Sequence, residues 1–458
     1  MPENQASPRS MRTFMIIWIG QLISQIGSGL TGFALAVWIF DQTRQATPFT
    51  FTVLLTTIPR LLLSPLAGSL ADRHNRRHLM LLADTGNALV TLAVVGLLWT
   101  GSLQVWHIYL IASLGAVFGA FQEPAFTASV AMLVPKEQLA RASGLSQLGH
   151  AVEMLVAPVI AGALFVTIGL RGIVLVDFVT YFFAVGALLL VRIPQPARAE
   201  SEQAAGPRSG VWADTAFGWR YLRERPGLFG LLVYFALVNF LLNIATVLTG
   251  PLVLSRYSAA VLGPVQMASG LGMLVGSLAM SAWGGPKRRI NAVIGFIGLA
   301  ALGLLVTGVR PEAVFAGAGL FVLLFSVPFA SASSQAIFQT KVAPAVQGRV
   351  FAMRSMISRS MTPLAFALAG PLADRVFEPL MQAGGALAVS PLGALLGVGA
   401  GRGVGLMFVT SSLVLLAATG LVYLNPRLRN IESELPDAVI KAAPEPEPEG
   451  ALRQAVAT

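Results

Sequence analysis

Long stretches without a single charged residue constrain the fold of this chain more than any other feature. Uncharged runs cover residues 14–40, 85–122, 227–255, 313–340 and 403–426. About 20 apolar residues in a helix cross the core of a bilayer. Only 11% of the 458 residues are charged, which is too few to coat a soluble protein of this size. A membrane β-barrel would instead alternate apolar and polar residues, so the continuous runs predict membrane-spanning helices.

Twelve such spans are expected, which predicts an all-α membrane protein. They cover residues 13–40, 49–71, 78–100, 106–133, 143–168, 172–192, 227–253, 260–283, 290–308, 312–339, 350–374 and 402–424. A stretch rich in Pro, Ala, Ser and Gly between the sixth and seventh spans is typical of a flexible linker. The sequence therefore predicts two six-helix bundles, over residues 1–193 and 227–426, joined by a linker over 194–226 and followed by a tail over 427–458.

The linker and the tail carry different signals. Residues 211–225 place Trp212, Phe217, Trp219 and Leu222 at roughly helical spacing beside three arginines, which predicts an amphipathic helix on the membrane surface; a soluble linker helix is the alternative. The tail has no apolar run and carries alternating Pro and Glu, so we expect it to be disordered. No structure is predicted for residues 376–401.

The basic residues predict the orientation. Of the 31 Lys and Arg residues, 23 fall in segments on the side of the N-terminus, six fall on the opposite side, and two, Arg60 and Arg359, lie within spans. Basic residues accumulate on the cytoplasmic side of membrane proteins, so we expect both termini in the cytoplasm and a location in a bacterial inner membrane. Because the net charge of +10 is spread over short loops, we expect no nucleic-acid partner.

Two kinds of chemistry have no residues to support them in this sequence. The chain has no cysteine and its four histidines are scattered, so we expect no metal site. It also lacks the phosphate-binding loop that ATP hydrolysis uses. We therefore expect no cofactor and no enzymatic activity, and any work across the membrane would draw on an ion gradient or on a substrate gradient.

One motif lies where the second span meets the cytoplasm. Residues 68–77 read Gly-Ser-Leu-Ala-Asp-Arg-His-Asn-Arg-Arg and resemble the signature of the major facilitator superfamily. Glycine lets two backbones approach closely, and an aspartate is favourable near the N-terminal end of a helix. The resemblance implies a gate that joins the two halves on the cytoplasmic side; a merely basic loop is the alternative. The matching gate residues are Gly68, Asp72, Arg73, Arg76 and Arg77.

Two further segments repeat parts of this motif. Residues 284–289, Gly-Gly-Pro-Lys-Arg-Arg, occupy the matching boundary in the second half, as a duplicated half would require. Residues 370–375, Gly-Pro-Leu-Ala-Asp-Arg, fall at the outer end of the eleventh span, where we expect a helix end and keep a gate as the alternative.

Other segments resemble the macrolide-efflux and siderophore-exporter branch of the drug:proton antiporters. They are residues 19–21, 133–139, 338–339 and 348–351. This resemblance implies a monomeric exporter of an amphipathic small molecule, such as a drug, a macrolide or a siderophore, by proton antiport, with membrane lipid as its other partner. A lysophospholipid flippase and a membrane sensor without transport are the alternatives. The uncharged stretch 111–122 departs from the pattern, because many proton-driven members carry a basic residue there.

Four charged residues fall near the middle of spans, namely Arg60, Glu123, Glu153 and Arg359. A charge there costs at least about 2.5–3.5 kcal/mol, so each needs a partner or a water-filled cavity. We predict that Glu123 or Glu153 takes up and releases a proton, with the arginines as partners; structural ion pairing is the alternative. Asp84 and Asp177, which lie nearer the ends of their spans, are interpreted as structural.

Amide side chains mark the expected substrate cavity. Gln21 and Gln25 lie four residues apart in the first span, as Asn239 and Asn243 do in the seventh, so each pair shares one helix face. The resemblance implies that these two spans line the cavity, and interhelical hydrogen bonding is the alternative. The candidate substrate contacts are Gln21, Gln25, Asn239, Asn243, Gln335, Gln339, Trp18 and Tyr234.

Overall fold

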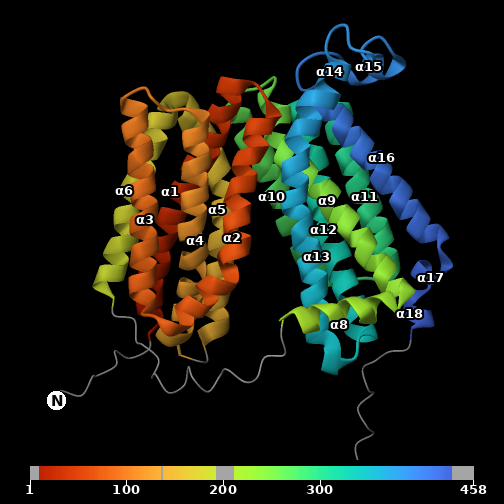
Figure 1. Cartoon of the computed structure of the whole chain (residues 1–458), viewed down its shortest axis with the longest axis horizontal. Helices are drawn as coiled ribbons and strands as arrows, with labels where there is room; N and C mark the ends of the chain where they lie inside the picture. Colours follow the sequence, from red (N-terminus) through yellow and green to blue (C-terminus); the bar gives the residue numbers. More distant parts are fainter. Residues whose placement is uncertain (1–9, 136–137, 192–210, 311, 436–458) are drawn as a thin grey trace, which may run out of the picture.

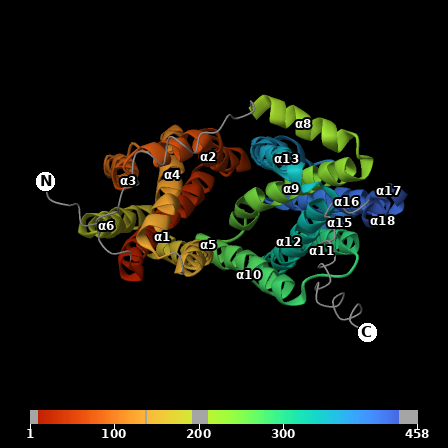
Figure 2. The same cartoon turned by 90° about the horizontal axis from the view of Figure 1, so that it is seen from below.

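The computed structural model describes residues 10–135, 138–191, 211–310 and 312–435, and within these residues it contains helices and no strand. Twelve long helices form two groups of six (Figures 1 and 2). The first group comprises α1 (Met11–Thr43), α2 (Ala46–Arg73), α3 (Arg76–Trp99), α4 (Val105–Leu133), α5 (Leu139–Thr167) and α6 (Gly169–Leu190). The second comprises α9 (Pro226–Leu254), α10 (Ala259–Trp283), α11 (Arg289–Val309), α12 (Ala313–Lys341), α13 (Pro344–Leu372) and α16 (Arg402–Leu424).

The length and composition of these helices match the predicted spans. Eleven helices in the described part of the chain are long and apolar enough to cross a membrane. The helix α13 is not among them, and it carries Arg349, Arg354 and Arg359 along its 29 residues. It nevertheless packs along α2 and α9 within the bundle (Figure 1). The prediction of an all-α, twelve-helix membrane protein is confirmed.

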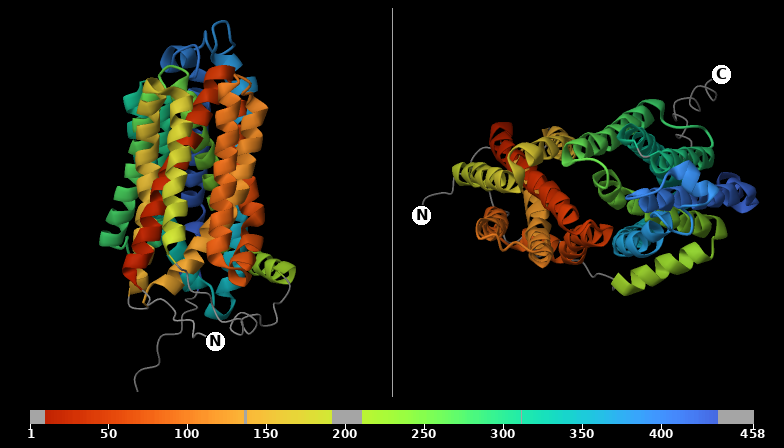
Figure 3. Two further views of the ribbon diagram at one scale, coloured as in Figure 1. Left: turned by 90° about the vertical axis from the view of Figure 1, so that its left-hand side faces the viewer. Right: turned by 90° about the horizontal axis from the view of Figure 1, so that it is seen from above.

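Short elements lie at the two ends of the bundle. The helix α8 (Val211–Arg223) lies beside the second half at one end, here named the α8 end. The opposite end, named the α15 end, carries a π-helical turn η2 (Ala373–Phe377), α14 (Glu378–Met381) and α15 (Pro391–Leu396), as Figures 1 and 3 show. These last elements form most of the segment for which the sequence predicts no structure.

The amphipathic helix expected in the linker is present as α8, and it lies along the side of the bundle beside α13 and α9 (Figure 2). The guanidinium of Arg349 lies 5.1 Å from the ring centre of Phe217, which is a cation–π contact. A Cβ on Gly218 would come within 3.0 Å of the Met353 Cβ, so the two helices pack closely. Residues 194–210 of the predicted linker lie outside the described residues.

The first nine residues of the expected tail, 427–435, are folded in this structure. Two short helices, α17 (Pro426–Arg429) and α18 (Ile431–Glu434), pack against the second half, and Ile431 is fully buried. The backbone N–H of Ile290 donates to the Glu432 carboxylate at 3.0 Å, and the Lys341 ammonium donates to the backbone carbonyl of Glu432. The prediction of disorder from residue 427 is thus wrong for 427–435, because these backbone contacts and one apolar anchor order the segment; residues 436–458 lie outside the described residues.

The two halves touch at the α15 end and diverge toward the α8 end (Figure 1). Two helix pairs make the contact, α2 with α13 and α5 with α10, and each pair lies side by side when seen from above (Figure 3). A Cβ on Gly263 of α10 would come within 2.9 Å of the Val159 backbone in α5, so only glycine permits this approach. An apolar cluster that includes Val37, Phe40 and Leu254 closes the space between the halves at this end.

A repeated hydrogen bond supports the duplication of the halves. Arg76 begins α3 and donates to the carbonyl of Ala128 in α4 at 3.0 Å. Arg289 begins α11 and donates to the carbonyl of Ala336 in α12 at 3.2 Å. Because α3 and α4 occupy the same order in the first half as α11 and α12 in the second, the two basic motifs hold equivalent helices together.

Candidate functional site

A cavity of about 610 Å³ lies among the helices of the first half. Its walls come from α1 to α6, and every lining residue belongs to this half of the chain. Leu139 and Ser143, at the start of α5, and Val130, near the end of α4, place part of the cavity toward the α8 end. A volume of this size is typical of sites for drug-sized ligands.

Polar side chains reach this cavity because they recur at helical spacing. On α3, Asp84, Asn87 and Thr91 all line it, and residues three or four apart share one face of a helix. On α5 the lining residues include Ser143, Ser146 and His150 with the same spacing, and Glu153 continues the row. Each of these helices therefore turns a polar stripe inward and apolar faces toward its neighbours and the lipid.

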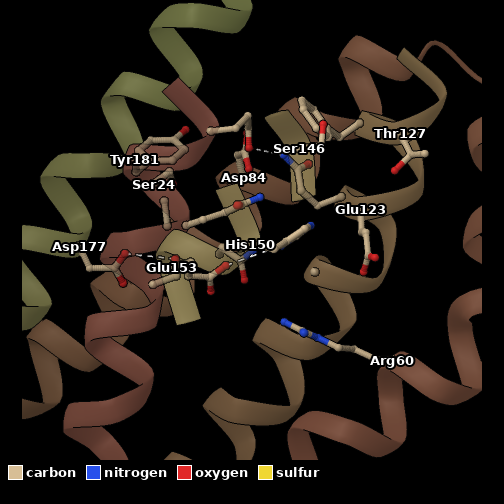
Figure 4. Close-up of a pocket in the computed structure, with 18 of the residues that line it drawn as sticks. Ser24, Arg60, Asp84, Glu123, Thr127, Ser146, His150, Glu153, Asp177 and Tyr181 are labelled. Atoms are coloured by element: carbon tan, nitrogen blue, oxygen red, sulfur yellow. Dashed lines mark hydrogen bonds and ion pairs between the residues drawn. The ribbon is translucent and has the colours of Figure 1, made fainter. Parts of the chain in front are cut away.

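Four carboxylates surround this space, from α3, α4, α5 and α6 (Figure 4). Asp84 is buried, and its Oδ2 accepts a hydrogen bond from the Gln21 amide at 2.9 Å. Gln122 in turn donates to the Gln21 Oε1 at 2.7 Å. These three residues form a chain of side chains that links α3, α1 and α4 beside the cavity.

The other carboxylates have weaker partners. Asp177 is buried and accepts from the hydroxyls of Ser28 at 3.2 Å and Thr91 at 3.3 Å. Glu153 lies 3.8 Å from the Nδ1 of His150, one helical turn earlier on α5. Glu123 is exposed to the cavity and has no ion pair within 4 Å among the described residues.

A second cavity, also about 610 Å³, adjoins the first and shares Arg60, Glu123 and Thr127 with it. Its walls are α2 and α4 from the first half and α13 from the second, which contributes Arg359. A Cβ on Gly119 would lie 3.2 Å from the Arg60 Nη2, so this glycine leaves room for the guanidinium. The two cavities together place the site between the halves as well as inside the first half.

The four residues predicted for proton coupling, Arg60, Glu123, Glu153 and Arg359, all line one or both cavities. No arginine lies within 4 Å of either glutamate in the described part of the chain. The arginines therefore share the space with the acids without the direct ion pairs that a purely structural role would require. The coupling role itself stays a prediction.

The amides predicted as substrate contacts fall into two sets, one that lines the first cavity and one that bonds within its own helix. Gln21 and Gln25 line the first cavity. The Asn239 amide donates to the carbonyl of Phe235 at 2.8 Å, and the Asn243 amide donates to the carbonyl of Asn239 at 2.7 Å. Both asparagine side chains thus bond to the preceding turn of α9, as polar side chains in membrane helices often do.

The remaining candidates also lie away from the two cavities. The Tyr234 hydroxyl lies 2.7 Å from the Thr419 hydroxyl in the contact between α9 and α16. Gln335 accepts from the Arg354 guanidinium at 2.6 Å, and Gln339 is exposed. Trp18 packs near Gly149, where a Cβ would lie 3.3 Å from the indole nitrogen. None of these residues lines either cavity, and their role in binding stays a prediction.

The predicted gate motif makes contacts only within its own half among the described side chains. Arg77 donates to the carbonyls of Leu188 at 2.7 Å and Leu189 at 3.1 Å, which belong to the last turn of α6. Nothing lies within 4 Å of a Cβ placed on Gly68, so the close approach expected there is not made in this structure. The side chains of Asp72 and Arg73 lie outside the described residues. This arrangement agrees with the separation of the halves at the α8 end.

Asp84 and Asp177 are the site residues that the sequence interpretation assigns to structure alone. Both line the first cavity and both bond only to amide or hydroxyl groups among the described residues. A signal for Asp84 is present in the sequence, since Asn87 and Thr91 extend it into a polar stripe on an otherwise apolar helix. Asp177 has Thr180 and Tyr181, three and four residues later, to mark its face.

Comparison with known proteins gives matches at both the sequence and the structural level. The family model of the Major Facilitator Superfamily matches residues 17–366. Macrolide efflux protein A of Streptococcus pyogenes is 28% identical over 371 residues, covering 79% of this chain and 90% of that protein. The enterobactin exporter EntS of Salmonella typhimurium is 27% identical over 269 residues, covering 58% of this chain and 62% of that protein.

A solved structure supports the fold. The inward-facing, unoccupied structure of a bacterial homolog of the human lysosomal transporter Spinster superposes with a TM-score of 0.63, at 16% sequence identity, over 91% of this chain and 97% of that one.

Proposed function

Because the chain belongs to the Major Facilitator Superfamily and is therefore a multi-pass membrane transporter and not an enzyme, we propose that it is a secondary active exporter of an amphipathic small molecule that exchanges its cargo for protons. The observation that carries this proposal is the group of four carboxylates around one cavity in a bundle whose α15 end is closed. The relatives named for macrolide efflux and enterobactin export support the direction of transport and the class of cargo.

The orientation follows from the distribution of basic residues. The α8 end carries the basic motifs at 73–77 and 287–289, and such residues accumulate on the cytoplasmic side. We therefore place the α8 end in the cytoplasm of a bacterium, the α15 end outside, and the protein in the inner membrane. In this orientation the described conformation is open to the cytoplasm.

The geometry suggests how the exchange operates. The two halves rock about the cavities, which lie near the middle of the membrane. In the cytoplasm-open state the carboxylates release protons and accept cargo from the cytoplasm or the inner leaflet. When the α15 end opens, the same groups face the more acidic side, take up protons and release the cargo outward.

Glu153 is the acid on which we would test coupling first. It stands at the middle of α5, 14 residues from the first residue of a 29-residue helix, and α5 packs directly against α10 of the other half. A change in its charge can therefore act on the contact between the halves. Its only ionisable neighbour within 4 Å in the described structure is His150, which leaves the carboxylate available for a proton.

The test is proton movement in proteoliposomes that contain a pH-sensitive dye, with panels of macrolides, siderophores and lysophospholipids. We expect one class to produce a pH change, which Glu153→Gln abolishes without loss of folded protein. The matched control is Glu312→Gln, which removes an exposed carboxylate at the α15 end, away from both cavities. Unchanged transport by Glu153→Gln would refute its coupling role, and lipid movement without any pH change would favour a flippase.

A further inference from the structure

The charges that line the two cavities do not balance. Four carboxylates, Asp84, Glu123, Glu153 and Asp177, face two guanidiniums. The other titratable side chains on the walls are His150 and Tyr181. Counted over the carboxylates and guanidiniums, the described walls carry a formal charge of −2. This excess is not neutralised locally, since the described structure places no Arg or Lys within 4 Å of any of the four acids.

An uncompensated negative charge within a membrane bundle is unfavourable and attracts positive charge. Protons supply that charge when no cargo is present. A cationic cargo would supply it equally well, whereas an anionic cargo would meet repulsion from both buried and exposed acids. The walls also carry Phe126, Phe178 and Tyr181, whose rings can bind an organic cation through their faces.

We propose that the cargo is an amphipathic organic cation, which binds the acid-lined cavity in competition with protons. This inference rests on the exporter function proposed above and specifies the charge of its substrate. The cation replaces protons on the carboxylates in the cytoplasm-open state, so cargo and protons cannot occupy the acids together. The two buried aspartates and Glu153 provide the charge, and the polar stripes of α3 and α5 accommodate substituents of varied shape.

The experiment compares two probes of nearly equal size and opposite charge, tetraphenylphosphonium and tetraphenylborate, by equilibrium binding to the purified full chain. Protein-free micelles give the background. We expect saturable binding of tetraphenylphosphonium only, at least about tenfold stronger than tetraphenylborate because unit charges at contact distance interact by several kcal/mol in a partly buried site. Its affinity should rise as pH rises, with protons released on binding.

Binding measurements on variants and on the unmodified protein each test the inference. Asp84→Asn and Glu153→Gln should each weaken tetraphenylphosphonium binding by about tenfold, while Glu312→Gln should leave it unchanged. Equal binding of the two probes, or a pH-independent affinity in the unmodified protein, would overturn the inference without any variant. Proton-linked transport of an anionic ligand would refute the cationic cargo alone, whereas cation binding without proton movement would refute the exporter alone.

A different observation concerns the contact between α2 and α13. These helices pack antiparallel, because α2 begins at the α15 end, where α13 finishes. Both finish with the same sequence except at one position, Gly-Ser-Leu-Ala-Asp-Arg at 68–73 and Gly-Pro-Leu-Ala-Asp-Arg at 370–375. One copy therefore lies at each end of the pair, at the end where the partner helix begins.

The copy at the α15 end is engaged. The two carboxylate oxygens of Asp374 accept hydrogen bonds from the backbone N–H groups of Ala46 at 2.8 Å and Thr47 at 2.7 Å. These are the first residues of α2, and the residue before them, Gln45, makes no side-chain cap. The second half thus caps a helix of the first half, and the negative charge also meets the positive end of the α2 dipole.

Gly370 makes the approach possible. A Cβ at this position would come within 2.5 Å of the Thr47 Cα and 3.0 Å of its nitrogen. Beyond it, α13 passes into the π-helical turn η2, which contains Asp374. Such turns are rare overall, and many of those known occur at functional sites. The helix end expected at 370–375 is present, since α13 ends at Leu372, and the same segment also joins the two halves.

We infer that Gly370 and Asp374 form a latch that holds the α15 end closed and breaks when this end opens. The same sequence at residues 68–73 would serve the α8 end in the opposite state. Each state then keeps one aspartate on one helix N-terminus, so the energy lost at one end is recovered at the other.

Distances between spin labels test the latch. The chain has no cysteine, so Arg44→Cys and Val376→Cys can be labelled without background, and both side chains are exposed at the α15 end of opposite halves. We expect short distances in the otherwise unmodified protein. Asp374→Asn should raise the ratio of long to short distances by at least about tenfold, because each of the two bonds to the charged acceptor exceeds one to a neutral acceptor by about 1 kcal/mol.

Gly370→Val is a second variant. It should disrupt the same contact between α13 and α2 by steric clash and shift the distances in the same direction. The control is Glu378→Gln, four residues after Asp374, whose carboxylate accepts from the Val404 N–H at 3.2 Å within its own half and should leave the distances unchanged. Unaltered distances in both Asp374→Asn and Gly370→Val, or an equal shift in Glu378→Gln, would overturn the latch.

Discussion

Replacing Asp84 by asparagine should stabilise the folded protein and abolish proton-linked transport. The side chain is 6% exposed and accepts a hydrogen bond from the Gln21 amide at 2.9 Å. An ionised carboxylate deep in a membrane bundle costs about 2.5–3.5 kcal/mol. The charged acceptor gains about 1–1.5 kcal/mol more from its hydrogen bond than the neutral amide that replaces it. The difference favours Asp84→Asn by about 1–2 kcal/mol, because asparagine keeps an acceptor for Gln21 and loses the charge.

The assay pairs thermal unfolding in detergent with proton movement in liposomes. We expect a higher unfolding midpoint for Asp84→Asn and no substrate-induced pH change, which is the trade-off found when a functional charge is removed. Asp41→Asn is the control, since that carboxylate is exposed and pairs with Arg44 at the surface; neither readout should change. A lower midpoint together with intact transport would refute the reasoning and return Asp84 to the structural role expected from the sequence.

Three further changes test the contacts around the site. Arg402→Leu should lower the unfolding free energy by about 2–4 kcal/mol, because this buried guanidinium donates at 2.8 and 3.1 Å to two carbonyls at the C-terminal end of α11. A thermal unfolding midpoint equal to that of the unmodified protein would contradict this. Gly263→Val should lower the unfolding free energy by about 1–3 kcal/mol through a clash with the α5 backbone, and it should slow transport. Thermal unfolding and liposome flux measure the two effects. Unchanged values would mean that α5 and α10 move apart without strain. Burial raises the pKa of Glu378; hydrogen bonds from backbone N–H groups lower it, and the Asp374 charge adds to the rise. Just above the ordinary pKa of a glutamate, the native state therefore binds more protons than the unfolded state. The free energy of unfolding should then fall as pH rises through that window. Unfolding midpoints measured across pH should show this slope, which Glu378→Gln should flatten; a slope of opposite sign would refute it.

The alternation of apolar and basic segments is sufficient to predict the architecture. Uncharged runs long enough to cross a bilayer appear directly in the sequence, and the observed helices begin and end within a few residues of the expected ones. The linker helix at 211–223 is equally visible, because an amphipathic stripe beside arginines is a local pattern. The mid-span charges also predict the region of the cavities, since all four line them.

The sequence is less informative about which polar residues meet. Asn239 and Gln21 look alike in the sequence, yet the amide of Asn239 bonds to its own helix and that of Gln21 bonds to a buried carboxylate on another. The position of Asp84 along its span suggests a structural role, whereas the helix face on which it lies decides whether it reaches a cavity. The order of helices around the bundle sets that face.

What the sequence determined by itself was everything governed by local pattern: the spans, their alternation and the six-plus-six division. Only the tertiary structure decided that Asp374 caps α2 and that four acids from four helices surround one cavity, because these contacts join residues far apart along the chain. The reason is physical. Hydrophobicity and helix formation act on neighbours along the chain, whereas a shared cavity or a bond between halves depends on how helices pack against one another.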